Sequence, residues 1–506
     1  MEVLSQLSWQ HVAGTIVVYL ASLAFYRLFL HPLAKFPGPR LAAVSRWYEA
    51  YYDVVCNGKY TFKIEEMHKK YGPIIRISPF ELHVSAPAFF EKLYNHDGPW
   101  NKYAWAYDAF SAKPSTICTI EHDVHRQRRA PLSAFFSKAN VAAKQEIIRR
   151  RTAQLCGRIA EFAGDRTAAV NLGTAMSAFA RDVAIEFILG KRYNNLESKD
   201  FSAAFTNVLQ GAGAVWRITK HVRWFGPFMK SLPPSLVAKL GDEGPKGFFA
   251  FLKDTMTLTR DTISSSTRSA VSASEKLAAP APANPPPPDE EKSGARINDE
   301  VGTVSGAAFE TTAQSLRLIV YYVYSDPDIL SRLRAELRSA TDDGAGSLSL
   351  AALEKLPYLT AVLMEGLRLS PGLATRTARV APNRELVYGQ WRIPAGTPVG
   401  MTTMLMHRDE QLYPEPKRFS PDRWVDMEVR RKAHKTYAPF ARGTRICLGM
   451  HLAWAELYMV VASLVQRFDF EFDGAGPKDV EPVSDQFTIG TEDQSGIKAF
   501  VTLYNG

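Results

Sequence analysis

A single cysteine near the C-terminal end of the chain lies in a setting that suits a metal-binding thiolate. It occupies the motif Phe440-x-x-Gly443-x-Arg445-x-Cys447-x-Gly449. The segment 448–468 that follows is mostly apolar with helical periodicity, so the dipole and free N–H groups of a helix start would lower the pKa of the thiol. The two glycines lack a Cβ and would let the backbone turn closely against a flat ligand. The pattern predicts an axial thiolate to a haem iron, which favours cleavage of an O–O bond.

An isolated cysteine is more often a small buried hydrophobic residue, and the case for a ligand depends on the fixed spacing around it. The other cysteines are Cys56, Cys118 and Cys156. Four cysteines in 506 residues, without a short paired spacing, argue against a disulfide framework and against a zinc site. Such cysteine usage indicates a reducing compartment.

A second candidate lies in the segment Gly306-Ala307-Ala308-Phe309-Glu310-Thr311-Thr312. It places a carboxylate and two hydroxyls on a predicted helix, among small residues that leave room for a planar cofactor or dioxygen. Taken alone the signal is weak, because threonines inside helices usually bond back to a carbonyl one turn earlier and a lone glutamate is usually solvated.

Charged pairs and arginines form a third group. Glu365 and Arg368 stand three residues apart on a predicted helix, and most such pairs are surface pairs worth a few tenths of a kcal/mol. Arginine is the side chain that binds carboxylates with two parallel hydrogen bonds, as the propionates of a haem would require.

Four motifs occur in a fixed order and together resemble the cytochrome P450 family. They are the Pro37-Gly38-Pro39 hinge, the pair Glu365-x-x-Arg368, the segment Phe419-x-Pro421-Asp422-Arg423-Trp424, and the cysteine loop. The resemblance covers nearly the whole chain. The segments 26–33 and 216–220 resemble fungal microsomal members of secondary metabolism, including the trichodiene-oxygenase-like group.

The resemblance implies a role for each motif. Glu310 and Thr311 would deliver protons during dioxygen activation, with Ala308 where the family commonly has glycine. Glu365, Arg368 and Arg423 would form a buried charge network whose loss abolishes haem incorporation. The residues expected to contact the haem are Cys447, Arg445, Arg129, His125, Arg376, Phe440, Gly443 and Gly449, with His125 in place of the family's tryptophan. Arg128 and Arg379 are expected to be surface or ion-pair residues.

The substrate pocket is expected above the haem and to be apolar. Its candidate residues are Trp105, Tyr107, Phe110, Ala307, Leu373 and Ala374. Each aromatic residue taken singly is more often part of the core. A pocket of this composition would favour a hydrophobic small molecule.

The N-terminal segment 12–30 is apolar except for Arg27 and is long enough to span a membrane. A cleaved signal peptide would begin with positive charge, whereas Glu2 is the only charged residue before this run. Basic residues at and after its end place the body of the protein in the cytosol. We expect a single-pass anchor in the endoplasmic reticulum membrane, made of residues 1–36, and one catalytic domain over 37–506.

The rest of the chain is expected to be mainly helical with small β-sheets, the cytochrome P450 fold. Helical periodicity covers 121–258 and 300–369, and short strand pairs are predicted at 74–85, 386–393 and 487–503. A Pro/Ala-rich stretch at about 264–294 should be an exposed loop inserted between two helices. The net charge of +9 is compatible with binding to an anionic membrane surface or to an acidic electron-donor protein. Aromatic residues do not alternate with the basic clusters, so we do not expect nucleic-acid binding.

We therefore expect a monooxygenase with haem b that inserts one oxygen atom of O₂, by hydroxylation or epoxidation, into a hydrophobic terpenoid or polyketide-type metabolite. Electrons would come from NADPH through a separate reductase, with cytochrome b5 as a second potential donor, because the chain has no G-x-G-x-x-G fingerprint. The alternatives are a haem-thiolate isomerase or dehydratase, and a non-catalytic haem-binding membrane protein. Neither needs the Glu310 and Thr311 pair.

Overall fold

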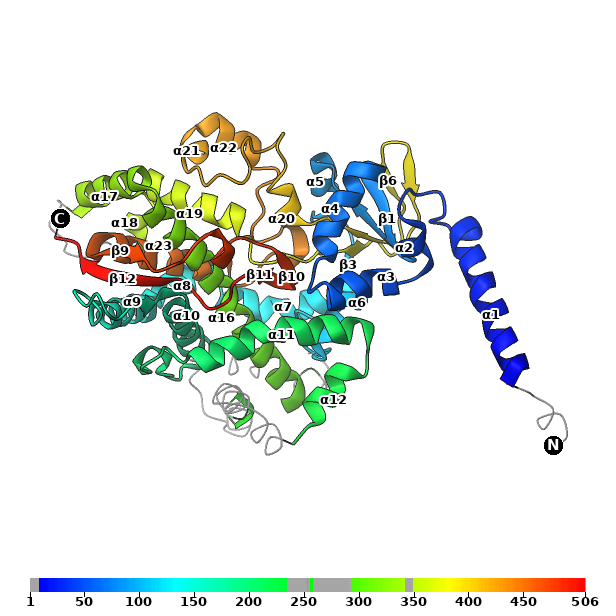
Figure 1. The fold of residues 1–506 in the computed structure, drawn as a ribbon, viewed down its shortest axis with the longest axis horizontal. Helices are drawn as coiled ribbons and strands as arrows, with labels where there is room; N and C mark the ends of the chain where they lie inside the picture. The colour runs from blue at the N-terminus through cyan, green and yellow to red at the C-terminus, as the bar shows by residue number, and fades with distance from the viewer. Residues whose placement is uncertain are drawn as a thin grey trace.

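The computed structural model describes residues 9–233, 253, 255–257, 291, 293–341 and 349–505. Helices gather in one half of the molecule and most of the small strands in the other, from which the N-terminal helix projects (Figure 1). The predicted Pro/Ala-rich loop at 264–294 lies outside the described residues, apart from its last positions.

The helices confirm a mainly α architecture. They are α1 (Trp9–Phe25), α2 (Arg40–Val44), α3 (Trp47–Ala50), α4 (Tyr60–Tyr71), α5 (Phe90–Leu93), α6 (Ala104–Tyr107), α7 (His122–Phe135), α8 (Lys138–Ala143), α9 (Gln145–Ala160), α10 (Leu172–Leu189), α11 (Ala203–His221), α12 (Phe225–Ser231), α16 (Gly294–Ser325), α17 (Pro327–Thr341), α18 (Leu350–Leu353), α19 (Pro357–Leu369), α20 (Thr403–Met406), α21 (Asp422–Val425), α22 (Met427–Ala433) and α23 (Met450–Arg467).

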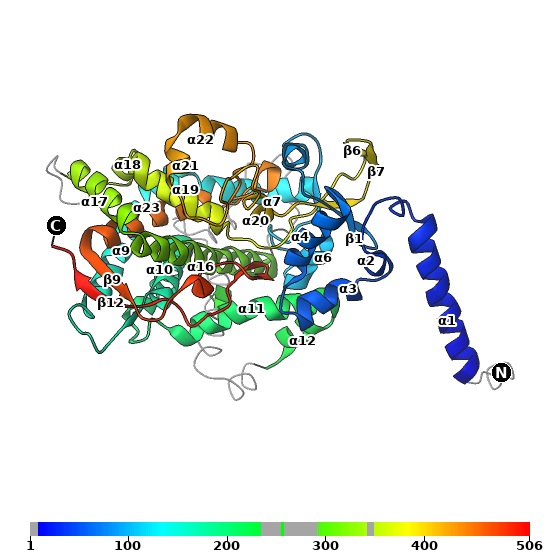
Figure 2. The same cartoon turned by 45° about the horizontal axis from the view of Figure 1, so that its top comes forward.

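The main core is built around α16, which packs against α10, α19 and α23 (Figure 2). Every residue of α10 is buried, and its mostly apolar sequence also buries Arg181, Asp182 and Glu186, which have polar or charged partners. Gly366 lets α19 approach α16 closely, because a Cβ at this position would lie 2.1 Å from Cγ1 of Ile319. The closely packed helices hold α16, and with it Glu310 and Thr311, in a fixed position in the interior.

Four small sheets complete the fold. The strands are β1 (Ile74–Ser78), β2 (Glu81–Val84), β3 (Asn101–Lys102), β4 (Val170–Asn171), β5 (Arg379–Val380), β6 (Leu386–Tyr388), β7 (Trp391–Ile393), β8 (Pro398–Gly400), β9 (Phe468–Phe472), β10 (Ser484–Gln486), β11 (Thr488–Gly490) and β12 (Lys498–Leu503). The largest sheet has the order β1-β2-β8-β5-β3, and only its β2–β8 pair is parallel.

The predicted hairpins at 74–85 and 386–393 are confirmed as β1–β2 and β6–β7. The predicted strand pair at 487–503 is wrong in its pairing. β11 pairs with β10, whereas β12 lies between β4 and β9 in another sheet. The short turn at Phe487, where the backbone takes a φ of +70°, closes the β10–β11 hairpin and leaves β12 free to join distant strands.

The N-terminal helix is a candidate membrane span. Residues Trp9–Leu30 form a mostly apolar helical segment of 22 residues, which contains an 18-residue window with a mean hydropathy of 1.7, and none of its residues is buried. At its end, Arg27 does not extend freely toward an interface: its guanidinium donates to the carbonyl of Val44 at 2.5 Å, and Arg76 donates to the carbonyl of Arg27 at 2.7 Å. The anchor is therefore tied directly to the globular body.

Candidate functional site

Cys447 lies between a single 3-10 turn, η8 (Gly443–Arg445), and the start of α23. Its backbone N–H donates to the carbonyl of Phe440 at 2.9 Å, which closes the loop. Gly443 has a φ of +72°, and a Cβ there would come within 2.5 Å of the Asn95 carbonyl oxygen. The Cys447 side chain is exposed, although Gly443 and Arg445 beside it are buried. The loop presents one sulfur atom from an otherwise closed turn.

The electrostatic setting of Cys447 differs from the sequence expectation. Desolvation by the surrounding protein raises the pKa of the Cys447 thiol, while the Gly449 N–H and the Arg129 guanidinium oppose that change. The side chain is accessible, yet protein groups replace most of the water near it. The helix start alone is too weak to produce a thiolate here, and a coordinated metal ion is what would deprotonate the thiol.

Four cations converge near this sulfur. They are Lys102, Arg129, Arg379 and Arg445, and none of them forms an ion pair with a described carboxylate. Burial lowers the pKa of Arg445 to about 9, with Arg379 adding to the effect. Burial, and then Arg445 and Arg379, also hold the pKa of Lys102 well below its ordinary value. A buried group of like charges is unfavourable unless anions join it.

The cluster is partly satisfied by backbone carbonyls. Arg445 donates to the carbonyls of Thr119 and Ile120, each at 2.8 Å, while its Nε is buried without a partner. Lys102 donates to the carbonyl of Ile117. Arg379 donates to the carbonyl of Thr377 at 3.0 Å. Neutral acceptors leave the charges uncompensated, so the donor set fits a ligand with two carboxylates next to a thiolate-bound metal. The two propionates of a haem meet that requirement.

His125, on α7, is placed beside these cations. Burial lowers the pKa of His125 to about 2, with Arg445, Lys102 and Arg129 adding to the effect. The imidazole is therefore neutral at physiological pH and keeps one N–H to donate. This state suits the predicted hydrogen bond to a propionate.

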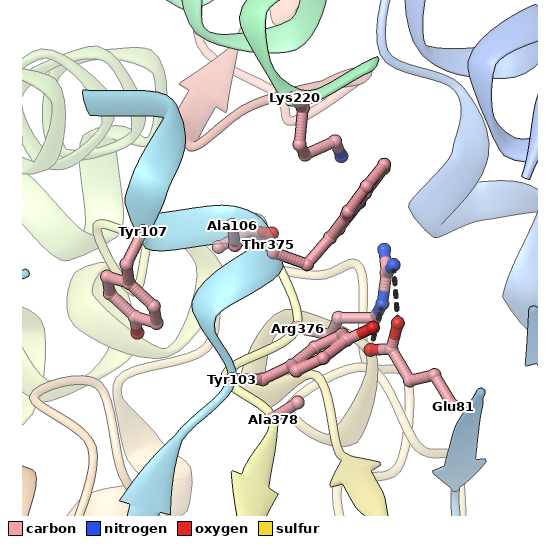
Figure 3. A pocket seen from close by; sticks show the side chains of 9 residues that line it. Glu81, Tyr103, Ala106, Tyr107, Lys220, Thr375, Arg376 and Ala378 are labelled. Carbon is pink, nitrogen blue, oxygen red and sulfur yellow. Dashed lines mark hydrogen bonds and ion pairs between the residues drawn. The ribbon is translucent and has the colours of Figure 1, made fainter. Parts of the chain in front are cut away.

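Arg376 lies elsewhere and does not join the cluster. Its Nε donates to Glu81 at 2.7 Å (Figure 3). Its Nη2 donates to Glu49 at 2.8 Å, so two buried carboxylates already neutralise it. Three residues further on, Arg379 is buried among the cations instead of being the predicted surface or ion-pair residue. Arg376 lies in the irregular segment before β5 (Arg379–Val380), and Arg379 lies in the strand itself, so the two arginines have different surroundings.

The carboxylate cluster around Arg376 is closed to metal ions. Glu49, Asp53 and His221 lie close enough to share a cation. However, Lys220 Nζ already lies 2.6 Å from Asp53 and 3.2 Å from Glu49. With Arg376 also bound to Glu49, the acidic groups have cationic partners, and the cluster joins the end of α11 to α3 and the following turn, η3 (Tyr51–Val55).

The predicted proton-delivery pair lies in the middle of α16. Thr311 donates its hydroxyl to the carbonyl of Ala307 at 2.8 Å, and Ala307 itself is exposed. Glu310 Oε2 accepts from Arg317 at 2.7 Å and from Ser177 at 3.2 Å. Its Oε1 forms an ion pair with the Arg181 Nη1 at 3.8 Å and has no hydrogen-bond partner among the described residues. The two side chains therefore leave the helix toward different partners.

The predicted charge network is present, with Glu365 and Arg368 fully buried and Arg423 half-buried. Glu365 accepts two hydrogen bonds from Arg368, both at 2.8 Å, and one from Arg423 at 3.0 Å. The Trp424 indole and the Ser420 backbone add donors at 2.8 and 2.9 Å. Arg368 also donates to the carbonyls of His407 and Pro416, each at 2.7 Å. This arrangement fixes the long segment that precedes the cysteine loop.

The candidate pocket residues divide into two groups. Phe110 packs with Phe487 at 4.7 Å between ring centroids, and Trp216 packs with Phe487 at 5.3 Å. Tyr107 is buried at the edge of this group, with Lys102 Nζ 4.0 Å from its ring centroid. Phe487 was missed from the sequence because nothing local marks the tip of the β10–β11 hairpin.

Two other candidates face away from the aromatic group. Trp105 lies under Arg46, at 3.9 Å from its ring centroid, and under Arg223 at 4.4 Å. Ala374 is fully buried in the core cluster with Met404 and Ile489. Leu373 is half-buried and bridges to Thr488, which places it next to the hairpin tip. Gly372 beside it lies near Thr311, with 3.8 Å between its ideal Cβ and the Thr311 Cβ.

Comparisons with known proteins agree with this geometry. The model of the Cytochrome P450 family matches residues 50–494. The chain is 36% identical to the cytochrome P450 monooxygenase sdnE of Sordaria araneosa, over 97% of this chain and 98% of that protein. It is 36% identical to the tryptophan 6-hydroxylase fscE of Fusarium equiseti, over 95% of this chain and 94% of that protein.

A third relative is the N-acetyltryptophan 6-hydroxylase ivoC of Emericella nidulans, 35% identical over 95% of this chain and 94% of that protein. Among solved structures, the retinoic acid bound cyanobacterial CYP120A1 has a TM-score of 0.67 at 19% identity, covering 87% of this chain and 94% of the other. The likeness in structure supports the fold.

Replacing Glu365 by Gln keeps the side-chain volume but removes the charge that compensates Arg368 and Arg423. We expect a loss of about 3 kcal/mol or more in the free energy of unfolding, and little haem bound, because two buried cations lose their partner. Urea unfolding and the haem-to-protein absorbance ratio measure both effects. Asp422→Asn is the matched control, since the Asp422–Arg332 pair is exposed and worth about 1 kcal/mol at most. Equal effects of the two changes would contradict the role of Glu365.

Proposed function

We infer that this chain, which belongs to the cytochrome P450 family and is a haem-thiolate monooxygenase of secondary metabolism, inserts oxygen into an apolar terpenoid or polyketide-type small molecule. The observation that supports this most strongly is the exposed sulfur of Cys447 near three buried cations, Lys102, Arg379 and Arg445, and the half-buried Arg129, which have no ion-pair partner among the described carboxylates. Haem bound here supplies the activation of O₂ through its thiolate-ligated iron.

The residues that would hold the haem follow from the site. Cys447 Sγ would ligate the iron, and Lys102, Arg129, Arg379 and Arg445 would neutralise the propionates, with the His125 N–H as a further donor. We replace Arg376 by Arg379 in this set, because Arg376 is neutralised by Glu49 and Glu81. Lys102 is an addition that the sequence motifs did not indicate.

Proton handling is assigned to Glu310 and Thr311. Glu310 Oε2 accepts from Arg317 and Ser177, and its Oε1 lies 3.8 Å from the Arg181 Nη1, so two arginines hold this carboxylate in place on α16. The Thr311 hydroxyl, on the next residue, would pass a proton toward the exposed Gly306-Ala307 face of α16. The retained pair disfavours an isomerase or dehydratase and a non-catalytic haem-binding protein.

The aromatic group of Phe110, Trp216 and Phe487 supports an apolar, ring-containing substrate. An aromatic amino acid or its N-acyl derivative is a second candidate, because two relatives are named as hydroxylases of tryptophan and N-acetyltryptophan. The anchor at Trp9–Leu30 supports an endoplasmic reticulum membrane location with the catalytic body in the cytosol. Electrons would then come from NADPH through a separate reductase, with cytochrome b5 as a second potential donor.

The proposal is tested by turnover of the purified full-length protein with reductase, NADPH and O₂. We expect an oxygenated product carrying one atom from ¹⁸O₂ with a terpenoid, polyketide or tryptophan derivative. Cys447→Ser should abolish both product and the reduced carbon monoxide spectrum of a thiolate-bound haem. The proposal would be contradicted if the wild type showed the carbon monoxide spectrum but gave no product with any of the three substrate classes.

Thr311→Ala tests the proton path. We expect a normal carbon monoxide spectrum but on the order of tenfold less product per NADPH, with hydrogen peroxide accounting for the difference. The ratio of product to NADPH consumed is the measurement. Thr312→Ala changes the neighbouring, buried threonine and should leave this ratio unchanged. Unaltered coupling in Thr311→Ala would remove this hydroxyl from the path.

Arg379→Gln tests the revised propionate assignment. The change removes the proposed charged hydrogen bond from Arg379 to a haem propionate. We expect the rate of haem release to rise on the order of tenfold, and this rate is measured as haem transfer to excess apomyoglobin. Arg384→Gln, at an exposed arginine bound to the Asp97 carbonyl, is the control and should not change the rate. If Arg379→Gln retains haem normally while folded Arg376→Gln releases it, the original assignment of Arg376 is correct.

A further inference from the structure

Two histidines away from the predicted haem contacts touch each other in the interior. His68, in α4, places its Nε2 2.7 Å from the Nδ1 of His83, in β2. His68 Nδ1 lies 2.8 Å from the carbonyl oxygen of Gly72, and His83 Nε2 lies 3.0 Å from the hydroxyl oxygen of Thr402. His68 is half-buried, whereas only 1% of the surface of His83 is exposed. One chain of polar contacts thus runs from the end of α4 to the segment after β8.

The contacts determine where the ring hydrogens lie while both imidazoles are neutral. A carbonyl oxygen only accepts, so His68 carries its hydrogen on Nδ1 and its Nε2 is an acceptor. His83 Nδ1 must then donate to His68 Nε2, which leaves His83 Nε2 to accept from the Thr402 hydroxyl. Every ring nitrogen has one partner in this neutral arrangement.

The folded protein resists protonation of this pair. With both imidazoles charged, two N–H groups would face each other across the 2.7 Å contact. Burial lowers the pKa of His68, and the Gly72 carbonyl opposes that change. Burial, followed by His68 and Arg376, holds the pKa of His83 well below its ordinary value.

No described carboxylate forms a hydrogen bond or an ion pair with either ring. Arg376 adds positive charge near His83, and its own partners are Glu49 and Glu81. Other ionisable side chains on the elements packed against α4 and β2 also have contacts of their own: Arg76 of β1 with the Arg27 and Pro79 carbonyls, Asp53 of η3 with Lys220, Asp485 of β10 with Thr61, and Glu65 of α4 with Lys69. Arg408, beyond α20, lies near Glu481 and Glu65. The surroundings therefore offer a protonated pair no counter-ion.

The chain of contacts ends at the strand beside the proposed propionate cluster. β8 lies between β2 and β5, with Gly400 opposite His83 and Val399 opposite Arg379. Because Thr402 comes two residues after β8, loss of its contact with His83 acts on the strand that also holds Arg379. We propose that His68, His83 and Thr402 form an acid-sensitive clamp on β8, which opens when the two rings take up protons and then weakens haem retention. The effect on haem rests on the proposed function, whereas the clamp does not.

Acid should destabilise the folded protein through this clamp. In the unfolded chain each imidazole binds a proton near pH 6.5, whereas the folded pair does so only at lower pH. The stability that the clamp contributes is complete above about pH 6.5 and is lost as the pH falls below that value. Each proton that the unfolded chain binds in excess raises the unfolding equilibrium constant about tenfold per pH unit.

Urea unfolding of the full-length protein in detergent, followed by tryptophan fluorescence at pH 7.0 and 5.0, tests the clamp. His83→Gln keeps a neutral donor for His68 and a neutral acceptor for Thr402 but binds no proton. The rise in the unfolding equilibrium constant between the two pH values should be about twentyfold smaller in His83→Gln than in the wild type. His434→Gln, at an exposed histidine after α22, is the control and should behave as the wild type.

A pH dependence in His83→Gln equal to that of the wild type contradicts the clamp. If His83→Gln fails to fold, His68→Gln at the half-buried end should also reduce the pH dependence, and an unreduced dependence there is equally contradictory. Haem transfer to excess apomyoglobin at pH 7.5 and 5.5 tests the effect on haem, and acid should speed it on the order of tenfold more in the wild type than in His83→Gln. Equal acceleration in both would overturn the link to Arg379. Neither measurement uses turnover, so failure of the monooxygenase proposal would be seen separately.

Discussion

The Glu365 carboxylate is the interaction on which the cysteine loop depends. Two oxygen atoms accept from Arg368, Arg423, Trp424 and the backbone of Ser420, all of them in the interior. Arg368 then binds the carbonyl of His407, whose Nε2 accepts from the Ala438 N–H at 3.0 Å. Burial lowers the pKa of His407 to about 3, so the ring is neutral and can accept this bond. A chain of hydrogen bonds thus runs from α19 to two residues before Phe440, and the position of Cys447 follows from it.

Buried charge has different consequences in different parts of this protein. Around Glu365 and around Arg376, each buried cation has a carboxylate partner, and these clusters hold elements together. Beside Cys447, cations gather without such partners, and each lowers the pKa of another. Because burying an unpaired charge costs several kcal/mol, the cluster beside Cys447 fits the proposed haem propionates, whereas the paired clusters need no further anion. Whether a buried arginine has a carboxylate partner therefore distinguishes structural arginines from candidate ligand-binding arginines better than its burial does.

The sequence predicted the parts of the site that lie within one motif. The turn of the cysteine loop, the Glu365–Arg368 contact and the helical positions of Glu310 and Thr311 appear as expected because local spacing determines them, whereas their roles in haem binding and proton delivery stay predictions. Arg423 reaches Glu365 from a separate motif. Arg376 and Arg379 could not be distinguished in this way. Both follow α19, and only the tertiary contacts of Arg376 with Glu49 and Glu81, nearly 300 residues earlier or more, show which one is already neutralised. Lys102 and Phe487 were missed for the same reason, since long-range packing alone brings them to the site.

The same long-range packing relates the membrane anchor to the pocket. Arg27 at the end of the apolar helix binds the Val44 carbonyl, and α3 follows directly, carrying Glu49. Glu49 binds both Arg376, in the segment between Gly372 and β5, and Lys220 at the end of α11. Displacing the anchor relative to the body would therefore disturb α11, and with it Trp216 and Arg217. These contacts connect the apolar N-terminal helix through α3 to α11, which carries Trp216 of the aromatic group.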